Sequence, residues 1–266
     1  MRTPAPVPMD TDRRTGGVVV RDVTVPVPDL PDVPAYLVRP GQAVFPDGAP
    51  AVLFLHWFDP RAANGDRTEF VAEAVRLAAR GVVALLPQQG FPWAGDPVGD
   101  ARDVAAIERE LTRAAAALAA LTELPEVDGN QVVVVGHDYG AMYGALLADR
   151  EPRVAGLAAL APDATWEHWF LAYWLGAGPA DSPAAAAYPD LFADLQPVDA
   201  VARVAAHRPV LLQFAEDDGY VDAAVRARFS TAATEPNVYP RAGHHLDLAA
   251  LIDRTAWLDW VLRLPG

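Results

Sequence analysis

Three polar residues, spaced widely along the chain, are the strongest candidates for covalent chemistry. Asp138 lies in a Gly-x-Asp-x-Gly stretch at 136–140, directly after four consecutive valines and before a run of small residues. This pattern predicts a buried strand, a sharp turn and a tightly packed helix, with the Asp138 side chain presented at the turn. Asp218 and His244 follow in the chain order nucleophile, acid, base. Together they predict attack by a carboxylate and then by water that His244 activates.

An aspartate predicts a different reaction from a serine at the same turn. Serine needs a base to remove its proton, whereas a carboxylate is already nucleophilic at neutral pH. We expect Asp138 to stay ionised, because a helix N-terminus favours negative charge. A carboxylate is suited to displacing a halide or opening an epoxide at a saturated carbon, which leaves an ester of Asp138. The competing interpretation of Asp138 is a helix cap without chemistry.

The elements that must position these residues alternate between strand and helix. Strands are expected at 17–27, 35–40, 51–58, 82–87, 131–136, 154–160, 209–215 and 237–240. Helices are expected at 66–80, 100–123 with Asp100 as cap, from the turn to 149, at 221–233 and at 247–263. Because the strands read as continuous apolar runs, the sequence predicts an α/β fold with a mostly parallel sheet covered by helices on both faces.

Polar residues collect where these strands end, which is where sites form in parallel sheets. They are His56, Asp59, Gln88, Gln89, Asp138, Asp217, Asp218, His244 and His245. The sequence therefore predicts one site at the carboxyl edge of the sheet.

The segments around these residues carry a family resemblance that covers about residues 17–263. They are "VPAYLVRP" before "PAVLFLHWF", "PEVDGNQVVVVGHDYGAMYG", "PVLLQFAEDDGYV" and "YPRAGHH". With them the chain resembles the α/β-hydrolase superfamily, and more closely its dienelactone-hydrolase-like branch. The stretch at 136–140 is similar to that of epoxide hydrolases and haloalkane dehalogenases, which use an aspartate nucleophile. The resemblance implies a short, aromatic-rich lid at about 162–207.

The resemblance also implies roles for individual residues. The family pattern Gly-x-x-Asp-x-x-Val favours Asp218 as the acid over Asp217 and Glu216, with Ala215 in the glycine position. A catalytic histidine directly after glycine favours His244, with His245 as the alternative. The oxyanion donors implied by the family are the backbone N–H groups of Phe58 and Tyr139.

Two departures bear on the substrate. Trp57 stands where the family has glycine, and Tyr139 stands where epoxide hydrolases and dehalogenases have tryptophan. Candidates to protonate an opening epoxide are Tyr139, Tyr173 and Tyr188, and halide donors are Trp57 or Trp93, whereas only Arg61 offers a cationic clamp. The predicted substrate pocket comprises His56, Trp57, Gln88, Trp93, Trp169, Tyr173 and Tyr188.

Composition excludes several classes of function. The 266 residues carry a net charge of −14, which argues against nucleic acid or an anionic membrane as a partner. There are no cysteines, and no spacing of His, Asp or Glu predicts a metal, so neither metal nor cofactor is expected. Without a signal peptide or an apolar membrane span, we expect a cytoplasmic protein with a flexible tail at 1–16 and one domain at 17–266. The oligomeric state stays open.

Three functions follow from these observations. The first is a hydrolase that opens an epoxide or cleaves a carbon–halogen bond in an apolar small molecule through an ester of Asp138. The second is a hydrolase of esters, lactones or thioesters of the dienelactone-hydrolase type. The third is a ligand-binding homologue without turnover. The ordered acid and histidine argue against the third.

Overall fold

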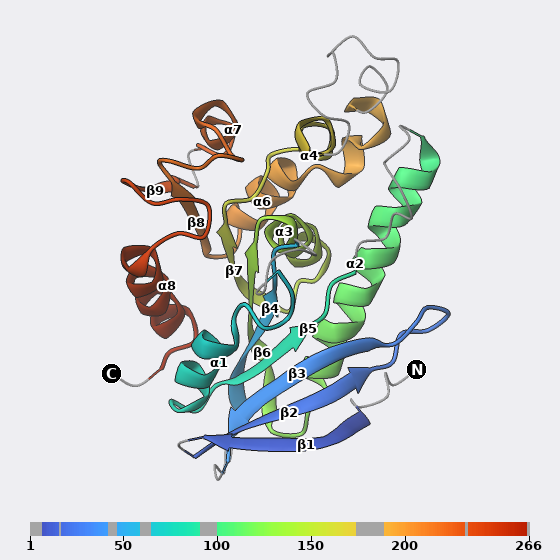
Figure 1. The fold of residues 1–266 in the computed structure, drawn as a ribbon, viewed down its shortest axis with the longest axis vertical. Coiled ribbons are helices and arrows are strands. Elements are labelled where there is room, and N and C mark those ends of the chain that lie inside the picture. The colour runs from blue at the N-terminus through green and yellow to red at the C-terminus, as the bar shows by residue number, and fades with distance from the viewer. Residues whose placement is uncertain are drawn as a thin grey trace.

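The described residues form a nine-stranded sheet (Figure 1). The computed structural model describes residues 7–15, 17–41, 47–58, 65–90, 100–173, 189–231 and 234–264. The strand order across the sheet is β1-β2-β3-β5-β4-β6-β7-β8-β9. The strands are β1 (Val7–Thr15), β2 (Val18–Val25), β3 (Val33–Pro40), β4 (Ala49–Leu55), β5 (Val83–Pro87), β6 (Val127–His137), β7 (Val154–Leu160), β8 (Val210–Ala215) and β9 (Asn237–Tyr239).

The sheet is parallel over most of its width. Strands β1, β2, β3 and β5 pair antiparallel, and every pair from β5 to β9 is parallel. All five residues of β5 are buried, and β4, β7 and β8 each have only one residue that is not. Such strands require cover on both faces, so the predicted mostly parallel, helix-covered sheet is confirmed.

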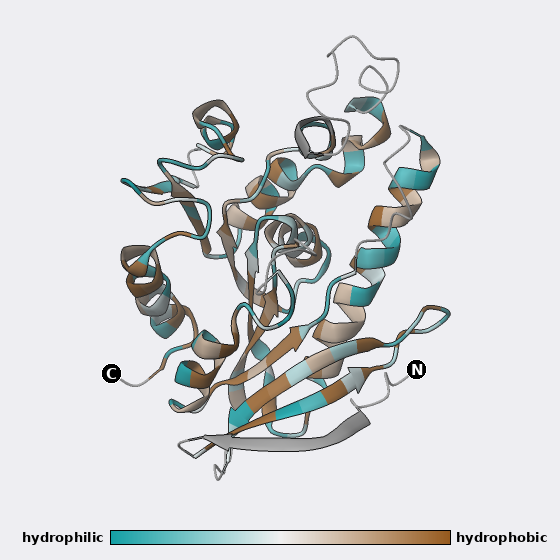
Figure 2. Ribbon diagram, viewed as in Figure 1, coloured by the Kyte–Doolittle hydropathy of each residue, from teal (hydrophilic) through white to brown (hydrophobic). Residues whose placement is uncertain are grey.

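Helices cover both faces of the sheet. They are α1 (Val71–Ala78), α2 (Ala101–Thr122), α3 (Tyr139–Arg150), α4 (Trp166–Tyr173), α6 (Pro197–Ala205), α7 (Ala223–Ala227) and α8 (Leu248–Val261). Buried side chains of α1 and α8 share one apolar cluster, those of α2, α3 and α6 share a second, and Ala250 of α8 lies in a small third cluster. In Figure 2 the central strands are largely hydrophobic, whereas α2 mixes hydrophilic with hydrophobic residues. Among the described helices, none combines the length and apolar character needed to cross a membrane.

The longest helix follows its sequence pattern closely. The side chain of Asp100 accepts a hydrogen bond from the N–H of Arg102 at 2.8 Å, so the predicted cap of α2 is confirmed. Ile107, Leu111 and Leu118, which recur at helical spacing, are buried against the sheet. This packing holds α2 against the central strands.

The N-terminal segment differs from its prediction. Residues 7–15, expected to belong to a loose tail, form β1 and pair with β2 across an irregular register between Pro8 and Asp12. Strand pairing uses backbone groups, so the free edge of β2 accepts a polar segment that has no apolar alternation. The composition of residues 7–15 therefore gave no indication of this strand.

Two helices also differ from their predictions. The helix expected at 66–80 begins only at Val71, because the Asp66 carboxylate accepts the N–H of Thr68 at 2.8 Å and holds a turn before it. The helix expected at 221–233 is the short α7, since the bonds beyond Ala227 run to the third preceding residue.

The segment expected as a lid is only partly separate from the core. Helix α6, which the sequence analysis did not predict, buries Ala200, Val201 and Val204 in the same cluster as α3. Trp166, at the start of α4, is fully buried, and its indole N–H donates to the carbonyl of Leu195 at 2.9 Å. Residues 174–188 of the expected lid lie outside the described residues.

Candidate active site

Asp138 lies in a strained turn between β6 and α3. Its φ of 48° and ψ of −115° belong to a region that side chains rarely adopt. A Cβ at Gly140 would lie 2.1 Å from the carbonyl oxygen of Leu55, and one at Gly136 would lie 2.4 Å from that of Gly140. The turn therefore needs both glycines. The sharp turn predicted at 136–140 is confirmed, and it presents Asp138 at the carboxyl edge of the sheet.

Asp138 is a half-buried residue. Burial raises its pKa, and the charge of Asp163 acts in the same direction. His244, His137 and the backbone N–H of Tyr139 act in the opposite direction. The expectation of an ionised carboxylate considered only the helix end, whereas burial works against ionisation here.

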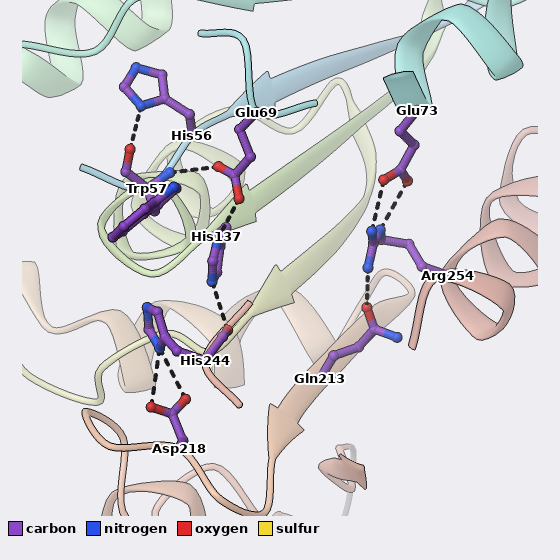
Figure 3. Close-up of polar contacts among 9 residues, drawn as sticks. All are labelled: His56, Trp57, Glu69, Glu73, His137, Gln213, Asp218, His244 and Arg254. Atoms are coloured by element: carbon purple, nitrogen blue, oxygen red, sulfur yellow. Dashed lines mark hydrogen bonds and ion pairs between the residues drawn. The ribbon is translucent and has the colours of Figure 1, made fainter. Parts of the chain in front are cut away.

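His244 and Asp218 form a hydrogen-bonded pair beside this turn (Figure 3). Nδ1 of His244 lies 3.1 Å from each carboxylate oxygen of Asp218, and the His244 side chain is buried. Burial acts to raise the pKa of Asp218, but hydrogen bonds from His244 and from the N–H groups of Tyr220 and Val221 lower it overall. Because Nδ1–H donates to Asp218, Nε2 keeps the lone pair that a general base needs.

The competing candidates occupy different surroundings. His245 is exposed, and its ring lies 4.5 Å from the ring of Trp57. Asp217 is exposed, and the Glu216 carboxylate accepts the N–H of Arg241 at 3.1 Å. Of these residues, only His244 and Asp218 contact each other as an acid and base pair would.

Glu69 connects the loop after β4, the end of β6 and, through His137, the loop that carries His244 (Figure 3). One carboxylate oxygen accepts the N–H of Trp57 at 2.9 Å, in the loop after β4. The other lies 2.5 Å from Nδ1 of His137, which directly precedes Asp138. Nε2 of His137 in turn lies 3.0 Å from the carbonyl oxygen of His244. The sequence analysis missed Glu69, which lies in the turn before α1.

A second buried network holds α8, the helix that follows the His244 loop (Figure 3). Arg254 of α8 donates to both carboxylate oxygens of Glu73 in α1, at 2.9 and 2.7 Å. It also donates to the side-chain oxygen of Gln213 in β8 at 2.7 Å. These charge-assisted hydrogen bonds join α1, α8 and β8 to one another.

His56 and Gln88, both predicted in the substrate pocket, bond to the protein. His56 is buried, with Nδ1 2.5 Å from the carbonyl oxygen of Trp57 and Nε2 accepting the N–H of Gln89 at 2.9 Å. The Gln88 amide donates to the carbonyl oxygen of Gln89 at 3.0 Å. Both ring nitrogens of His56 thus bond to the loops after β4 and β5, and its place in the pocket stays a prediction.

The two residues implied as oxyanion donors lie next to each other. The rings of Phe58 and Tyr139 are 5.9 Å apart, and the Tyr139 N–H interacts with the Asp138 carboxyl. The N–H of Trp57 is bonded to Glu69. The roles of Phe58 and Tyr139 stay predictions, and their placement beside Asp138 is compatible with them.

The aromatic residues predicted to line a pocket divide into two groups. Trp169 is buried and stacks on Tyr139, with ring centroids 5.4 Å apart. The Tyr139 hydroxyl is buried and donates to the carbonyl oxygen of Gly90 at 3.0 Å, so it is not placed to protonate an opening epoxide. Outside the described residues lie Asp59, Arg61, Trp93, Tyr188 and the side chain of Tyr173.

One group of described residues has ligand atoms close enough for a metal ion, namely Glu69, His137 and His245, whose atoms lie within 4.8 Å of one another. Glu69 and His137 already bond to each other, and Nε2 of His137 bonds to a carbonyl oxygen. A cation here would have to replace the proton between Glu69 and His137. The geometry therefore favours an ion pair at this point.

Comparison with protein families places the chain. The model of the prolyl oligopeptidase family matches residues 69–255, a span that includes Asp138, Asp218 and His244. The chain belongs to the prolyl oligopeptidase family. This prolyl oligopeptidase family member has no significant match among curated proteins.

Solved structures similar to this family member share the α/β-hydrolase fold, which confirms the predicted fold class. Acetyl xylan esterase from Paenibacillus sp. R4 has a TM-score of 0.75 at 13% identity, over 98% of this chain and 88% of that chain. A putative dienelactone hydrolase from Klebsiella pneumoniae has 0.63 at 18% identity, over 92% and 98%. Est1E from Butyrivibrio proteoclasticus has 0.67 at 19% identity, over 91% and 98%. These matches do not confirm the narrower resemblance to epoxide hydrolases and dehalogenases.

Proposed function

We propose that this protein hydrolyses carboxylic esters, lactones or thioesters of small apolar molecules, with Asp138 as nucleophile and His244 as base. The observation that carries the proposal is the bonded pair of His244 and Asp218 beside the strained turn that presents Asp138. Two of the similar structures, an acetyl xylan esterase and a putative dienelactone hydrolase, support ester hydrolysis.

The reaction begins when an Asp138 carboxylate oxygen attacks the carbonyl carbon of the substrate. The bond from that carbon to the alcohol oxygen breaks, which leaves a mixed anhydride of Asp138 and releases the alcohol once its oxygen has gained a proton. Nε2 of His244 then removes a proton from water, and the hydroxide attacks the acyl carbon. Asp138 departs as a carboxylate. One ester and one water thus give one acid and one alcohol.

The surroundings of Asp138 act on its ionisation in both directions. Burial has the largest effect and raises its pKa, whereas the charge of His137 and the N–H of Tyr139 favour the carboxylate that the reaction needs. The N–H groups of Tyr139 and Phe58 are the proposed donors to the oxyanion that forms in each step. The strained backbone keeps the carboxylate at the edge of the sheet.

A second candidate reaction is the cleavage of an epoxide or carbon–halogen bond. The observation that favours it is the carboxylate itself, because a carboxylate needs no base in order to displace a leaving group from saturated carbon. The intermediate is then an alkyl ester of Asp138. Water activated by His244 would attack the carbonyl carbon of Asp138 instead of an acyl group from the substrate.

The His244→Gln variant tests both reactions. Attack by Asp138 still occurs in this variant, but hydrolysis of the intermediate is blocked, so a covalent adduct should accumulate. Intact-protein mass after rapid acid quenching, with aryl epoxides, haloalkanes and activated esters in separate incubations, reports its size. Peptide mapping then assigns it to the peptide that contains Asp138.

Single-turnover hydrolysis by the unmodified protein in ¹⁸O-labelled water distinguishes the two intermediates. Attack on the acyl group places ¹⁸O in the product acid, whereas attack on an alkyl ester places it in Asp138. Asp138→Asn is the control that should form no adduct, and His245→Gln is the matched control that should keep full turnover. If the Asp138→Asn variant hydrolyses every ester at an unchanged rate, Asp138 is not the nucleophile. If no class of substrate gives an adduct or is turned over by the unmodified protein, a ligand-binding protein is favoured.

A further inference from the structure

Asp163 and His168 form a third carboxylate and imidazole pair at the carboxyl edge of the sheet, besides Asp218 with His244 and Glu69 with His137. Asp163 follows β7 and is fully buried, whereas 38% of the His168 side chain in α4 is exposed. Nδ1 of His168 lies 2.6 Å from one oxygen of Asp163, and the other oxygen accepts the N–H of Thr165 at 3.2 Å. Because Nδ1 faces Asp163, Nε2 is the ring nitrogen left for solvent or a ligand.

This pair lies close to the proposed nucleophile. The N–H of Asp138 donates to the carbonyl oxygen of Leu160 at 2.8 Å, which joins the ends of β6 and β7, and Asp163 comes three residues later. The charge of Asp163 acts on the Asp138 carboxyl. Figure 1 shows α4 and α7 above the same edge of the sheet, and Asp222 and Arg228 at either end of α7 act electrostatically on His168. His168 therefore lies on the rim of the site.

An aspartate nucleophile creates a need that a serine nucleophile does not. A serine gives its proton to the histidine, and the histidine passes that proton to the leaving group. Asp138 attacks as a carboxylate and has no proton to give. A His244 that is neutral from the start of the cycle, with Nδ1–H on Asp218 and the lone pair on Nε2, has no proton to give to the leaving oxygen either. The first step therefore needs another acid whenever the leaving group is an ordinary alkoxide.

Few described groups at this edge are placed to act as that acid. The Tyr139 hydroxyl donates to Gly90 and is buried. His56 uses both ring nitrogens within the protein, as does His137. His168 combines a buried carboxylate partner with a partly exposed ring.

We propose that His168, held by Asp163, is the acid that protonates the leaving oxygen of the substrate, an inference that rests on the proposed attack by Asp138. As the bond between the acyl carbon and the leaving oxygen breaks, that oxygen takes the proton from Nε2 of His168. The alcohol leaves, and the neutral ring of His168 regains a proton from solvent, to which it is exposed. The proton that His244 takes from water goes to solvent, so the overall balance is unchanged.

The charged neighbours of His168 support this role. The hydrogen bond to Asp163 raises the pKa of His168, although partial burial acts against it. The charges of Asp163 and Asp222 raise it further, and Arg228 lowers it. The ring therefore keeps its proton to higher pH than an isolated histidine does.

The dependence on the leaving group tests the proposal. The His168→Gln variant is compared with the unmodified protein on two acetate esters, p-nitrophenyl acetate and ethyl acetate. Nitrophenolate leaves without a proton, whereas ethoxide does not, so kcat/KM should fall about 100-fold or more for ethyl acetate and change little for p-nitrophenyl acetate. The rate for ethyl acetate should also decline as the pH rises through the pKa of His168. His207→Gln, an exposed histidine before β8, is the matched control.

Each result has a separate meaning. If the unmodified protein hydrolyses both esters and His168→Gln lowers both rates equally, or neither, His168 is not the acid and the proposed function stands. If the unmodified protein hydrolyses neither ester, nor any other acyl substrate, the proposed ester hydrolysis fails and the role of His168 fails with it. A selective loss on ethyl acetate, absent in His207→Gln, supports both.

Discussion

Oε1 of Glu69 lies 2.5 Å from Nδ1 of His137, and this pair lies next to the turn that presents Asp138. The other nitrogen of His137 faces the carbonyl oxygen of His244, which can only accept a hydrogen bond. Both nitrogens of His137 therefore donate, and the ring is a cation paired with Glu69. Burial lowers the pKa of His137, but Glu69, Asp138 and the carbonyl of His244 outweigh it and raise the pKa overall.

The first prediction concerns this ion pair. Glu69→Gln leaves the buried cation of His137 without its partner, so the free energy of unfolding should fall by about 3 kcal/mol. The ion pair stabilises the fold only while the His137 ring is protonated. The loss of unfolding free energy caused by Glu69→Gln should therefore shrink as the pH rises through the raised pKa of His137. Urea unfolding at several pH values measures both effects. Glu108→Gln, which removes a half-exposed partner of Arg150, should cost under about 1 kcal/mol, and equal losses in the two variants would contradict the ion pair.

The second prediction concerns Glu110, which is buried on α2 between Gly90 and Arg113. Burial raises its pKa from 4.5 to about 7, although its bond from Gly90 and the charge of Arg113 oppose this. The folded state therefore holds a proton that the unfolded chain releases, so stability should fall as the pH rises from 4.5 to about 7. Glu110→Gln mimics the neutral carboxyl, so it should be about 2 kcal/mol more stable than the unmodified protein at pH 8.

Thermal or urea unfolding at pH 4 and pH 8 checks this second prediction. The two proteins should have similar stability at pH 4, where the carboxyl is protonated in both the folded and the unfolded state. A variant that is less stable than the unmodified protein at pH 8 would show that pairing with Arg113 outweighs burial, and that the pKa of Glu110 is not raised.

The third prediction concerns the closest approach in the strained turn. A Cβ at Gly140 would lie 2.1 Å from a backbone oxygen of β4, which cannot move without disturbing the sheet. Gly140→Ala should therefore destabilise the fold by more than about 4 kcal/mol or prevent folding. At Gly219 a Cβ would meet nothing within 4 Å, so Gly219→Ala is the matched control and should unfold at nearly the same urea concentration as the unmodified protein. Similar midpoints for the two variants would show that the turn relaxes.

The sequence predicted those parts of the molecule that depend on local pattern. Apolar runs gave the central strands, and the spacing of Ile107 and Leu111 gave α2. The turn around Asp138 was predictable because both of its glycines are required by close backbone contacts. Gly136 meets the backbone of the turn itself, and Gly140 meets the end of the neighbouring strand β4. Polar edge pairing gave no such signal, so β1 was missed.

The parts of the site that depend on distant contacts could not be predicted. Glu69 lies in a turn without periodic pattern, and its partners Trp57 and His137 are 12 and 68 residues away. His56 has the type and place of a pocket residue, but its two bonds to the backbone become visible only when the ends of β4 and β5 lie side by side. The sequence gives no signal for His168, because the burial of Asp163 leaves no trace in it.

The fourth prediction concerns the nucleophile itself. Asp138→Asn keeps the size of the side chain and removes its negative charge, so turnover should fall by about 1,000-fold or more while the unfolding midpoint changes little. Asp138→Ser should instead hydrolyse p-nitrophenyl acetate, because His244 with Asp218 behind it can remove the serine proton. The same serine variant should lose any activity toward haloalkanes, since a neutral hydroxyl displaces halide poorly.

Rates for both variants on the ester and on a haloalkane check this expectation. An active Asp138→Ser variant would show that the acid, the base and the oxyanion donors are assembled for acyl transfer, and that the identity of one side chain selects the intermediate. An inactive serine variant beside an active unmodified protein would show that the surroundings of Asp138 are fitted to a carboxylate. The second result would favour the alkyl-ester intermediate. In that intermediate the water activated by His244 attacks the carboxyl carbon of Asp138, which lies at a different position from the acyl carbon of an ester substrate.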